Sequence, residues 1–507
     1  MRVLLWHGWL LEGSGTNVFT ARGAEELRTE GHDVALVCQE GHPERYAWID
    51  AWTRVDGDGP AELTPNPHAT PAPADGRCVL LRPSIGSLLP VFVIDEYEGF
   101  EVKTFLELTD DELATYLDRN VAALRAAAAW HGTESAFADH SVPGGPVAAR
   151  ALPAGSFVVK TAGSDLEYAL RPQARYRELA AEGIRAARAL IGPSADVIAR
   201  ALELTGTDGA ATRLVAPGVD TGRFRPGDGR ASLRIAADRL DGDDEVVRGR
   251  PSSLDADVAR ALADRDAGAF DRLAHAYDQR VPDPSAADRL RRLADRDGPL
   301  VAYFGKLIKL KGPHLLLAGA ATSATRPEVL VVGFGLWREH VEVLAAAIRS
   351  GDADALRWLQ QLGVVPRETD VDALAAAGPT AGGVTFTGRL DHRYAPEALA
   401  AVDVLVVPSI LDEAFGMVVA EGAAAGALPL VAGHSGLAEV AHALEADVGM
   451  PGAFTFAPGP GAADRIAEGI DRLLALEPAE RRELGARLAS SVAARWSWSR
   501  SAKALLV

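Results

Sequence analysis

Cysteine is scarce in this sequence, with only Cys38 and Cys78 among 507 residues. One possible pair makes no disulfide framework, and such scarcity fits a reducing compartment. The sequence also lacks an apolar run of the roughly 20 residues needed to span a bilayer, and it lacks a signal-peptide core. We therefore expect a cytoplasmic protein without an integral membrane segment.

Positive charge is in short supply as well. The 52 lysines and arginines face 70 aspartates and glutamates, which gives a formal net charge of −18. This balance argues against a nucleic-acid partner, whose phosphates need a broad basic footprint. Metal-ligand spacing is also lacking, because the two cysteines lie far apart in the sequence and His434 and His442 fit no ligand pattern. We expect no metal, and an anionic ligand needs local basic groups.

Apolar residues are plentiful at 48% of the chain, and the length suggests two to four domains. The start of the sequence predicts a strand (3–6), a glycine-containing loop, a helix (18–29) and a second strand (34–38), which is how a Rossmann fold opens. A dinucleotide fingerprint needs a third glycine where Val18 stands, so binding of a nicotinamide cofactor is disfavoured. Gly13 and Gly15 either form a simple turn or present their amides to a ligand.

The stretch from Pro408 to Gly422, PSILDEAFGMVVAEG, is the most informative part of the sequence. The apolar run before it predicts a buried parallel strand, and a helix is expected from about Phe415. Glu413 then lies in the loop and Glu421 in the helix, so both can face the end of the strand, where ligands bind in parallel sheets. The first turn offers an anion site through the backbone amides of Gly416, Met417 and Val418. This combination suits a phosphate-linked polyol such as a nucleotide sugar.

Two glutamates eight positions apart, bracketing Phe415-Gly416 and preceded by Pro408-Ser409, resemble the signature of retaining glycosyltransferases of the GT-B type, family four of the glycosyltransferases. The resemblance implies an α/β fold with two Rossmann-like domains facing a cleft, and a C-terminal helix that crosses back to the first domain. It implies that Glu413 holds sugar hydroxyls of a nucleotide diphosphate sugar and that Glu421 holds the ribose. The family generally needs no metal and no other cofactor, and sugar retention is ascribed to front-face attack assisted by the donor phosphate.

The same resemblance extends to further donor-side positions. Lys306, where the family usually has arginine, and Lys311 would clamp the diphosphate; a lysine at 306 offers a point charge instead of a bidentate fork. Arg389 and Leu390 stand where the family holds the nucleotide base, mainly through the backbone. Arg389 is equally well interpreted as a solvated surface charge. The implied donor site comprises Gly13, Gly15, Lys306, Lys311, Arg389, Leu390, Glu413, Phe415, Gly416, Met417, Val418 and Glu421.

Three positions in the first half belong to the acceptor side or to the reacting centre in this interpretation. His140 follows Ala138-Asp139, where the family places a histidine beside its acceptor cleft; a lone histidine at a strand end is also commonly structural. Ala162 stands where the family often has a catalytic histidine, and it is either natural or an introduced substitution. Asp165 lies on the acceptor side or serves as a helix N-cap.

The expected domains are an acceptor-side Rossmann-like domain over 1–216, a nucleotide-sugar domain over 217–484, and a returning C-terminal helix over 485–507. Residues 227–297 are rich in Asp, Arg and Ala and predict a helical or flexible insertion in the second domain. Trp496 and Trp498 are expected to pack where the chain returns to the first domain.

The leading hypothesis is a retaining hexosyltransferase that moves a sugar from a nucleotide diphosphate donor to a small molecule or glycan. Two alternatives remain open: a nucleotide-sugar epimerase on the same architecture, and a catalytically weak nucleotide-sugar binding protein, which Ala162 favours. The sequence specifies neither the nucleotide and sugar, nor the acceptor, nor the oligomeric state.

Overall fold

The computed structural model describes residues 1–93 and 97–506, and its internal contacts divide the chain into two compact units. The first unit comprises Met1–Gly218 and the C-terminal residues from Trp496, and the second comprises Val219–Arg495. The sequence placed the corresponding boundaries after residues 216 and 484. Among the described residues, no helix is both long enough and apolar enough to cross a membrane.

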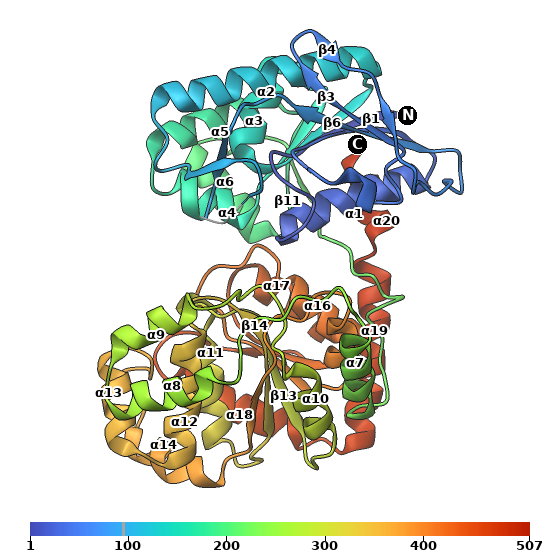
Figure 1. The fold of residues 1–507 in the computed structure, drawn as a ribbon. Coiled ribbons are helices and arrows are strands. Elements are labelled where there is room, and N and C mark those ends of the chain that lie inside the picture. The colour runs from blue at the N-terminus through green and yellow to red at the C-terminus, as the bar shows by residue number, and fades with distance from the viewer. Residues whose placement is uncertain (94–96, 507) are drawn as a thin grey trace. The chain divides into compact units, whose positions relative to one another are not determined.

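The first unit is built around a mostly parallel sheet with helices on both faces (Figure 1). Its strand order is β12-β11-β10-β9-β1-β2-β6-β3-β4, so the direction of strand addition reverses between β9 and β1. The strands are β1 (Arg2–Trp6), β2 (Asp33–Val37), β3 (Ala51–Asp56), β4 (Gly59–Pro60), β6 (Arg77–Pro83), β9 (Ser135–Ala138), β10 (Phe157–Lys160), β11 (Ala189–Gly192) and β12 (Thr212–Leu214); β5 (Thr64–Pro65) pairs with β3, and β7 (Leu88–Val91) pairs with β8 (Glu101–Thr104).

Helix α1 (Gly15–Thr29) and the long helix α2 (Asp110–His131) lie on opposite sides of this sheet (Figure 1). The sequence predicted that α1 begins at residue 18, but the Oγ of Ser14 accepts a hydrogen bond from the Asn17 amide at 3.2 Å and starts the helix earlier. Gly15 is therefore the first residue of a helix and not a loop glycine. The remaining helices are α3 (Gly145–Ala151), α4 (Gly163–Asp165), α5 (Ala174–Ala186) and α6 (Ala195–Thr205).

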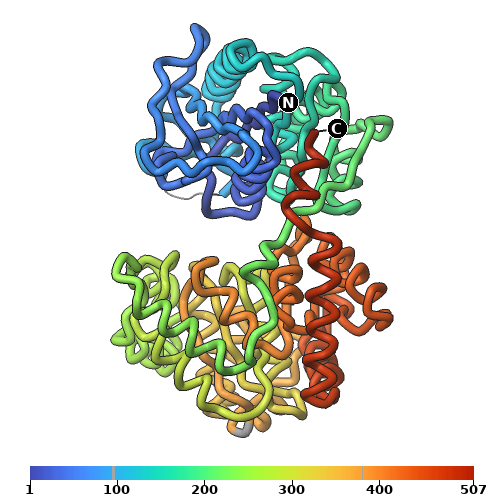
Figure 2. The backbone as a smooth tube through the Cα atoms, turned by 90° about the vertical axis from the view of Figure 1, so that its right-hand side faces the viewer, coloured from blue at the N-terminus to red at the C-terminus, as the bar shows by residue number. Residues whose placement is uncertain are grey.

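The C-terminal helix α20 (Trp498–Leu505) belongs to the first unit, where it packs along α1 (Figure 2). The rings of Trp498 and Phe19 lie 6.2 Å apart, and Leu505 packs against Gly23. A Cβ on Gly218 would lie 2.3 Å from the Trp498 backbone nitrogen, so the chain passes here only as glycine. The crossing back that the fold class predicts is therefore present, and Trp498 is buried.

The second unit contains a parallel sheet with the strand order β15-β14-β13-β16-β17-β18, the 3-2-1-4-5-6 order of a Rossmann fold. Strand β13 is longer than the sequence predicted because its pairing with β14 continues to Lys306 opposite Phe334. The strands are β13 (Leu300–Lys306), β14 (Glu328–Phe334), β15 (Val384–Phe386), β16 (Val404–Val407), β17 (Leu428–Ala432) and β18 (Thr455–Phe456). The helices after the insertion are α11 (Pro313–Thr322), α12 (Arg338–Ser350), α13 (Ala353–Gln361), α14 (Val371–Ala377), α15 (Ala395–Leu399), α16 (Met417–Ala424), α17 (Ser435–Val448), α18 (Ala462–Leu474) and α19 (Pro478–Arg495).

The segment between 227 and 297 is helical and packs on this sheet. Asp283, just before its last helix, accepts two hydrogen bonds from Arg338 at 2.7 and 2.6 Å, and both side chains are buried. The Asp283 amide donates to the Thr387 carbonyl at 2.9 Å. The insertion therefore supports the loop after β15. Its helices are α7 (Ala231–Asp241), α8 (Leu254–Ala263), α9 (Ala267–Ala274) and α10 (Ala286–Ala294).

Candidate active site

In the second unit, the strand order reverses between the neighbouring strands β13 and β16. Ligands of open parallel sheets bind beyond the carboxyl ends of the strands at such a reversal. Lys306 ends β13 and Lys311 follows in the next turn, while Glu413 lies in the loop after β16. The fold thus brings these three predicted residues to one edge of the sheet, although more than a hundred positions separate Lys306 from Glu413.

Glu413 is held from several directions. Its Oε1 accepts from the Lys311 ammonium and, at 2.9 Å, from the Ser409 hydroxyl. Its amide donates to the Ser435 hydroxyl at 3.0 Å, and its carbonyl accepts from the Gly436 amide at 3.0 Å. Both its backbone and its carboxylate therefore have a fixed orientation, which a residue that positions sugar hydroxyls requires.

The position of Lys311 depends on the glycine that follows it. Gly312 has a φ of 71°, and a Cβ at this position would lie 2.0 Å from the carbonyl oxygen of Pro408. Only glycine tolerates this left-handed conformation together with so close a backbone approach. The Lys311 turn can therefore lie directly against the loop that carries Glu413.

His434, which immediately precedes α17, contacts the loop that leads to Glu413. Its Nδ1 lies 3.1 Å from Oδ1 of Asp412, and its Nε2 lies 2.9 Å from the carbonyl oxygen of Ser409. Both partners offer acceptor oxygens, so the ring nitrogen that carries the proton has an acceptor within hydrogen-bond distance in either tautomer. The sequence analysis noted His434 only as a residue that fits no metal-ligand pattern, whereas in the structure it bridges both ends of the 409–412 segment.

Lys306 and Arg389 approach the same aromatic ring. The Lys306 Nζ lies 5.8 Å from the centroid of Phe334, and the Arg389 Cζ lies 5.2 Å from it. Lys306 is exposed at the sheet edge. These two cations supply local positive charge of the kind that an anionic ligand needs in an acidic chain, and Lys311, which pairs with Glu413, adds a third cation nearby.

Helix α16 begins at Met417, four positions after Glu413, with Gly416 as its N-cap at a φ of 90°. The amides of Met417 and Val418 lie in its first turn, where they have no partner within the helix. Glu421, one turn further on, is nearly buried, and its Oε1 lies 3.3 Å from Nε2 of His392. The side chains of Phe415 and Leu390 are buried, so any role of these two residues toward a ligand falls to the backbone.

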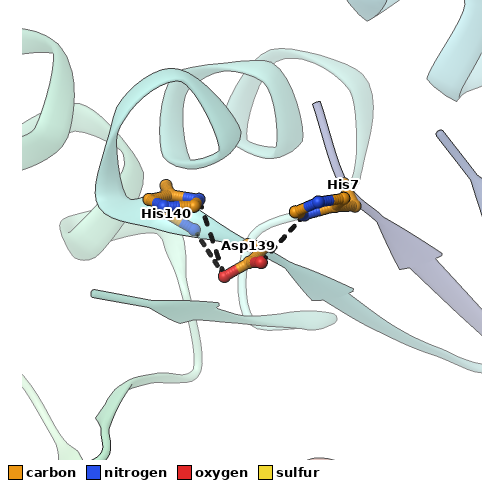
Figure 3. Close-up of side chains that lie close together, drawn as sticks. All are labelled: His7, Asp139 and His140. Carbon is orange, nitrogen blue, oxygen red and sulfur yellow. Dashed lines mark hydrogen bonds and ion pairs between the residues drawn. The ribbon is translucent and has the colours of Figure 1, made fainter. Parts of the chain in front are cut away.

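The strand order of the first unit reverses between β1 and β9, and a second polar cluster lies there (Figure 3). Asp139 follows β9 and is fully buried; its Oδ2 lies 2.9 Å from Nδ1 of His7 and accepts from Thr20 at 3.0 Å. Its Oδ1 pairs with the ammonium of Lys160 at 2.9 Å. Burial alone would raise the pKa of Asp139, but Lys160 and the two histidines hold this pKa well below its usual range.

His140 lies beside this pair in an unusual backbone conformation with a φ of 65°. The centroid of its ring lies 4.8 Å from that of Trp9, in an edge-on arrangement, and 5.0 Å from that of Phe92, in a tilted one. Burial lowers the pKa of His140 to about 3, so the ring is neutral at pH 7. Its Nε2 lies 3.2 Å from the Ser164 hydroxyl, and its buried Nδ1 has no hydrogen-bond partner within the described part of the chain. A strained, incompletely paired histidine at a strand end is typical of a functional site.

His7, Asp139 and His140 bring ligand atoms within 4.8 Å of one another, the kind of grouping that can hold a metal ion. The Lys160 ammonium occupies one oxygen of Asp139, and His7 binds the other. A cation would have to displace both, so we interpret the cluster as a buried charge network. Sequence reasoning missed His7 and Lys160; the available signal was that each directly follows or ends an apolar strand.

The other predicted positions of the first unit lie nearby but differ in exposure. Asp165 is fully buried, and its carboxylate accepts from the amides of Ser141 at 2.8 Å and Ala162 at 2.9 Å, so it holds this turn together. Ala162 follows β10 and is 5% exposed. Gly13 has a φ of 97°, and no atom lies near the position a Cβ would take.

The fold and the two strand-order reversals define the class: two Rossmann-like domains of the GT-B glycosyltransferase type. Sucrose-phosphate synthase from Thermosynechococcus elongatus is similar with a TM-score of 0.57 at 18% identity, covering 99% of this chain and 96% of that one. HepE from Anabaena, in complex with UDP and glucose, has a TM-score of 0.55 at 14% identity, covering 99% and 98%. Trehalose 6-phosphate synthase from Burkholderia multivorans has a TM-score of 0.51 at 13% identity, covering 99% and 97%. At these identities the likeness establishes the fold alone.

Within the chain, residues 286–488 match the family model described as glycosyl transferases group 1. The matched segment contains every candidate residue of the second unit, from Lys306 to Glu421. A search of curated proteins found no significant match. The family match and the fold together support a glycosyltransferase.

Proposed function

We propose that this protein is a retaining glycosyltransferase that transfers a hexose from a nucleoside diphosphate sugar to an acceptor hydroxyl. The observation that carries the proposal is the convergence of Lys306, Lys311 and Glu413 with the first turn of α16 at the strand-order reversal. The ammonium groups of Lys306 and Lys311 and the backbone amides of the first turn of α16 suit a diphosphate. The carboxylate of Glu413, whose orientation is fixed, suits sugar hydroxyls.

In the proposed reaction, the bond between the anomeric carbon and the diphosphate oxygen breaks, and the electron pair leaves with the nucleoside diphosphate. The acceptor oxygen bonds to the anomeric carbon on the same face, and its proton passes to a donor phosphate oxygen. Lys306, Lys311 and the amides at Gly416 stabilise the negative charge that develops on the leaving group. This charge stabilisation would substitute for a metal ion, so we propose catalysis without one.

The donor is best sought first among UDP-hexoses, because HepE from Anabaena, which shares the fold, was solved with UDP and glucose and with UDP-glucose. Glu421 would contact the ribose and Glu413 the hexose. In the first unit, His140 and its surroundings would face the acceptor side. In this proposal the donor binds to the second unit and the acceptor binds to the first.

The test measures UDP release and product formation from UDP-glucose with a panel of sugar and sugar-phosphate acceptors. Release of UDP in proportion to a new glycoside, with the anomeric configuration of the donor retained by NMR, supports the proposal; Lys311→Ala should abolish both. Conversion of the donor sugar to an isomer without UDP release would indicate an epimerase. Donor binding without turnover on any acceptor would favour a binding protein.

A further inference from the structure

Two arginines lie side by side in the first sheet, near the carboxyl ends of the neighbouring parallel strands β3 and β6. Arg54 and Arg82 are register partners, so their side chains leave the same face of the sheet about 4.8 Å apart. Like charges directly opposite each other destabilise a sheet. Within residues 1–93 and 97–506, neither guanidinium forms an ion pair or a side-chain hydrogen bond.

Arg82 is partly buried. Its Cζ lies 5.6 Å from the ring centroid of Phe100, and a Cβ on Gly41 would lie 3.9 Å from its Nη1. The guanidinium therefore reaches the loop after β2, in the direction of the strand-order reversal. Burial and the charge of Arg54 both lower the pKa of Arg82, which reflects a cation whose charge is poorly compensated.

Glu40 offsets part of this charge through space, but it forms no ion pair with Arg82. Glu40 is buried, and its two oxygens accept from the amides of Leu11 at 3.1 Å and His42 at 3.0 Å and from the Tyr46 hydroxyl at 3.3 Å. Elsewhere in this acidic chain arginines find acid partners readily, as Arg150 does with Glu182 at 2.8 Å. Among the described residues, an adjacent pair of arginines without a carboxylate in an ion pair is therefore unusual. Two solvated surface charges do not explain the partial burial of Arg82.

We propose that Arg54 and Arg82 bind an oxyanion, a phosphate or carboxylate group, on the acceptor. The planar fork of arginine matches the oxygens of either group, and a bound anion removes the repulsion between the two guanidinium groups. Strand β6 is two positions from β1 in the sheet, about 10 Å from the reversal where His140 lies. This separation accommodates a sugar ring between the anion and the reacting hydroxyl. The argument for anion binding depends on the arginine pair alone. The assignment of that anion to the acceptor rests on the proposed function.

The experiment uses the full chain and three variants. Arg82→Gln and Arg54→Gln remove the proposed contacts, and Arg77→Gln is the matched control because Arg77 is exposed at the opposite end of β6. Thermal unfolding is followed with inorganic phosphate against chloride at equal ionic strength. Calorimetry then measures the binding of glucose 6-phosphate, glucuronate and glucose, without any nucleotide.

We expect phosphate to raise the Tm of the wild type and of Arg77→Gln by more than that of Arg82→Gln, in which only the proposed diphosphate site of the second unit is left to bind it. The Kd of glucose 6-phosphate should rise at least tenfold in Arg82→Gln and Arg54→Gln, and glucose should bind more weakly than either charged sugar. Without phosphate, Arg54→Gln should raise the Tm slightly because it relieves repulsion, whereas loss of a merely structural arginine would lower it. The preference between glucose 6-phosphate and glucuronate identifies the oxyanion.

Equal affinities in all four proteins, or no binding of either anionic sugar to the wild type at millimolar concentration, would overturn the proposal. A Tm loss in Arg54→Gln together with unchanged binding would show a structural role instead. Binding of glucose 6-phosphate that depends on Arg82, in a protein that transfers no sugar from any nucleotide donor, would refute the proposed function and leave the anion site in place.

Discussion

His434 offers the sharpest test of how the loop that carries Glu413 is held. Replacing it with alanine removes two contacts, one to the Ser409 carbonyl at 2.9 Å and one to the Asp412 carboxylate at 3.1 Å. A hydrogen bond contributes about 0.5–1.5 kcal/mol and one involving a charged group about 1.5–3. The His434 side chain is 20% exposed and that of Asp412 is 43% exposed, so solvent screening places the combined loss near the lower values, about 1–2 kcal/mol.

This loss should weaken binding of UDP-glucose by roughly 5- to 30-fold, since about 1.4 kcal/mol corresponds to a factor of ten. The affinity for UDP alone should change little, because the two contacts of His434 go to Ser409 and Asp412, which precede Glu413 in the loop, and not to Glu421. Calorimetric titration of His434→Ala with both ligands measures the difference. His442→Ala is the matched control, since His442 is an exposed residue of the same helix, α17.

An equal loss of affinity for UDP and UDP-glucose would refute this reasoning, because it would mean that His434 supports the whole nucleotide site. Unchanged affinity for both would mean that the Ser435 and Gly436 contacts to Glu413 suffice without the histidine. Circular dichroism and the Tm of both variants establish that the fold is retained. A fall in UDP-glucose affinity in His442→Ala of the same size would likewise contradict a role specific to His434.

Three further predictions concern the donor site and the reacting centre. Replacing Lys306 or Lys311 with alanine should weaken UDP binding about tenfold or more, a charge-assisted contact being worth roughly 1.5–3 kcal/mol; unaltered affinity in both variants would refute the diphosphate assignment. Glu421→Gln should weaken binding of UDP itself, whereas Glu413→Gln should leave UDP affinity intact and lower turnover, and titration with UDP separates the two. Ala162→His should raise the transfer rate at saturating donor by about 10- to 1,000-fold, the range for single polar catalytic groups; a variant no faster than the wild type would show that the site is organised differently around the buried alanine.

The sequence predicts the fold well where strands are continuous apolar runs. Val404–Val407 and the run ending at Phe304 are buried strands, as their composition indicates, and parallel pairing then places their carboxyl ends at one edge. The family resemblance implied that Lys306, Lys311 and Glu413 belong to one donor site, and this topology brings them to the same edge of the sheet. The strand end at Lys306 was misplaced by two residues, because pairing with β14 continues past the last apolar side chain.

The network in the first unit was beyond sequence reasoning for a different reason. His7 and Asp139 lie 2.9 Å apart across 132 positions, and neither belongs to a motif whose spacing reveals the other. The pairing of Arg54 with Arg82 depends on strand register, which a single sequence without a tight hairpin does not specify. His434 attracted notice only as an unusual residue, and its partners became evident only from the loop geometry.

The first unit is assembled from two segments far apart in the chain, and this has a consequence for biosynthesis. Helix α20 covers Phe19 and Gly23 of α1, yet its first residue, Trp498, is synthesised 280 residues after Gly218. At bacterial or eukaryotic elongation rates of about 5–20 residues per second, that apolar stripe on α1 stays open for roughly 15–60 s while the second unit emerges from the ribosome. A nascent chain stalled or cleaved before Trp498 would therefore contain all of the second unit but would lack α20 of the first unit. Its α1 would expose an apolar surface that chaperones can bind.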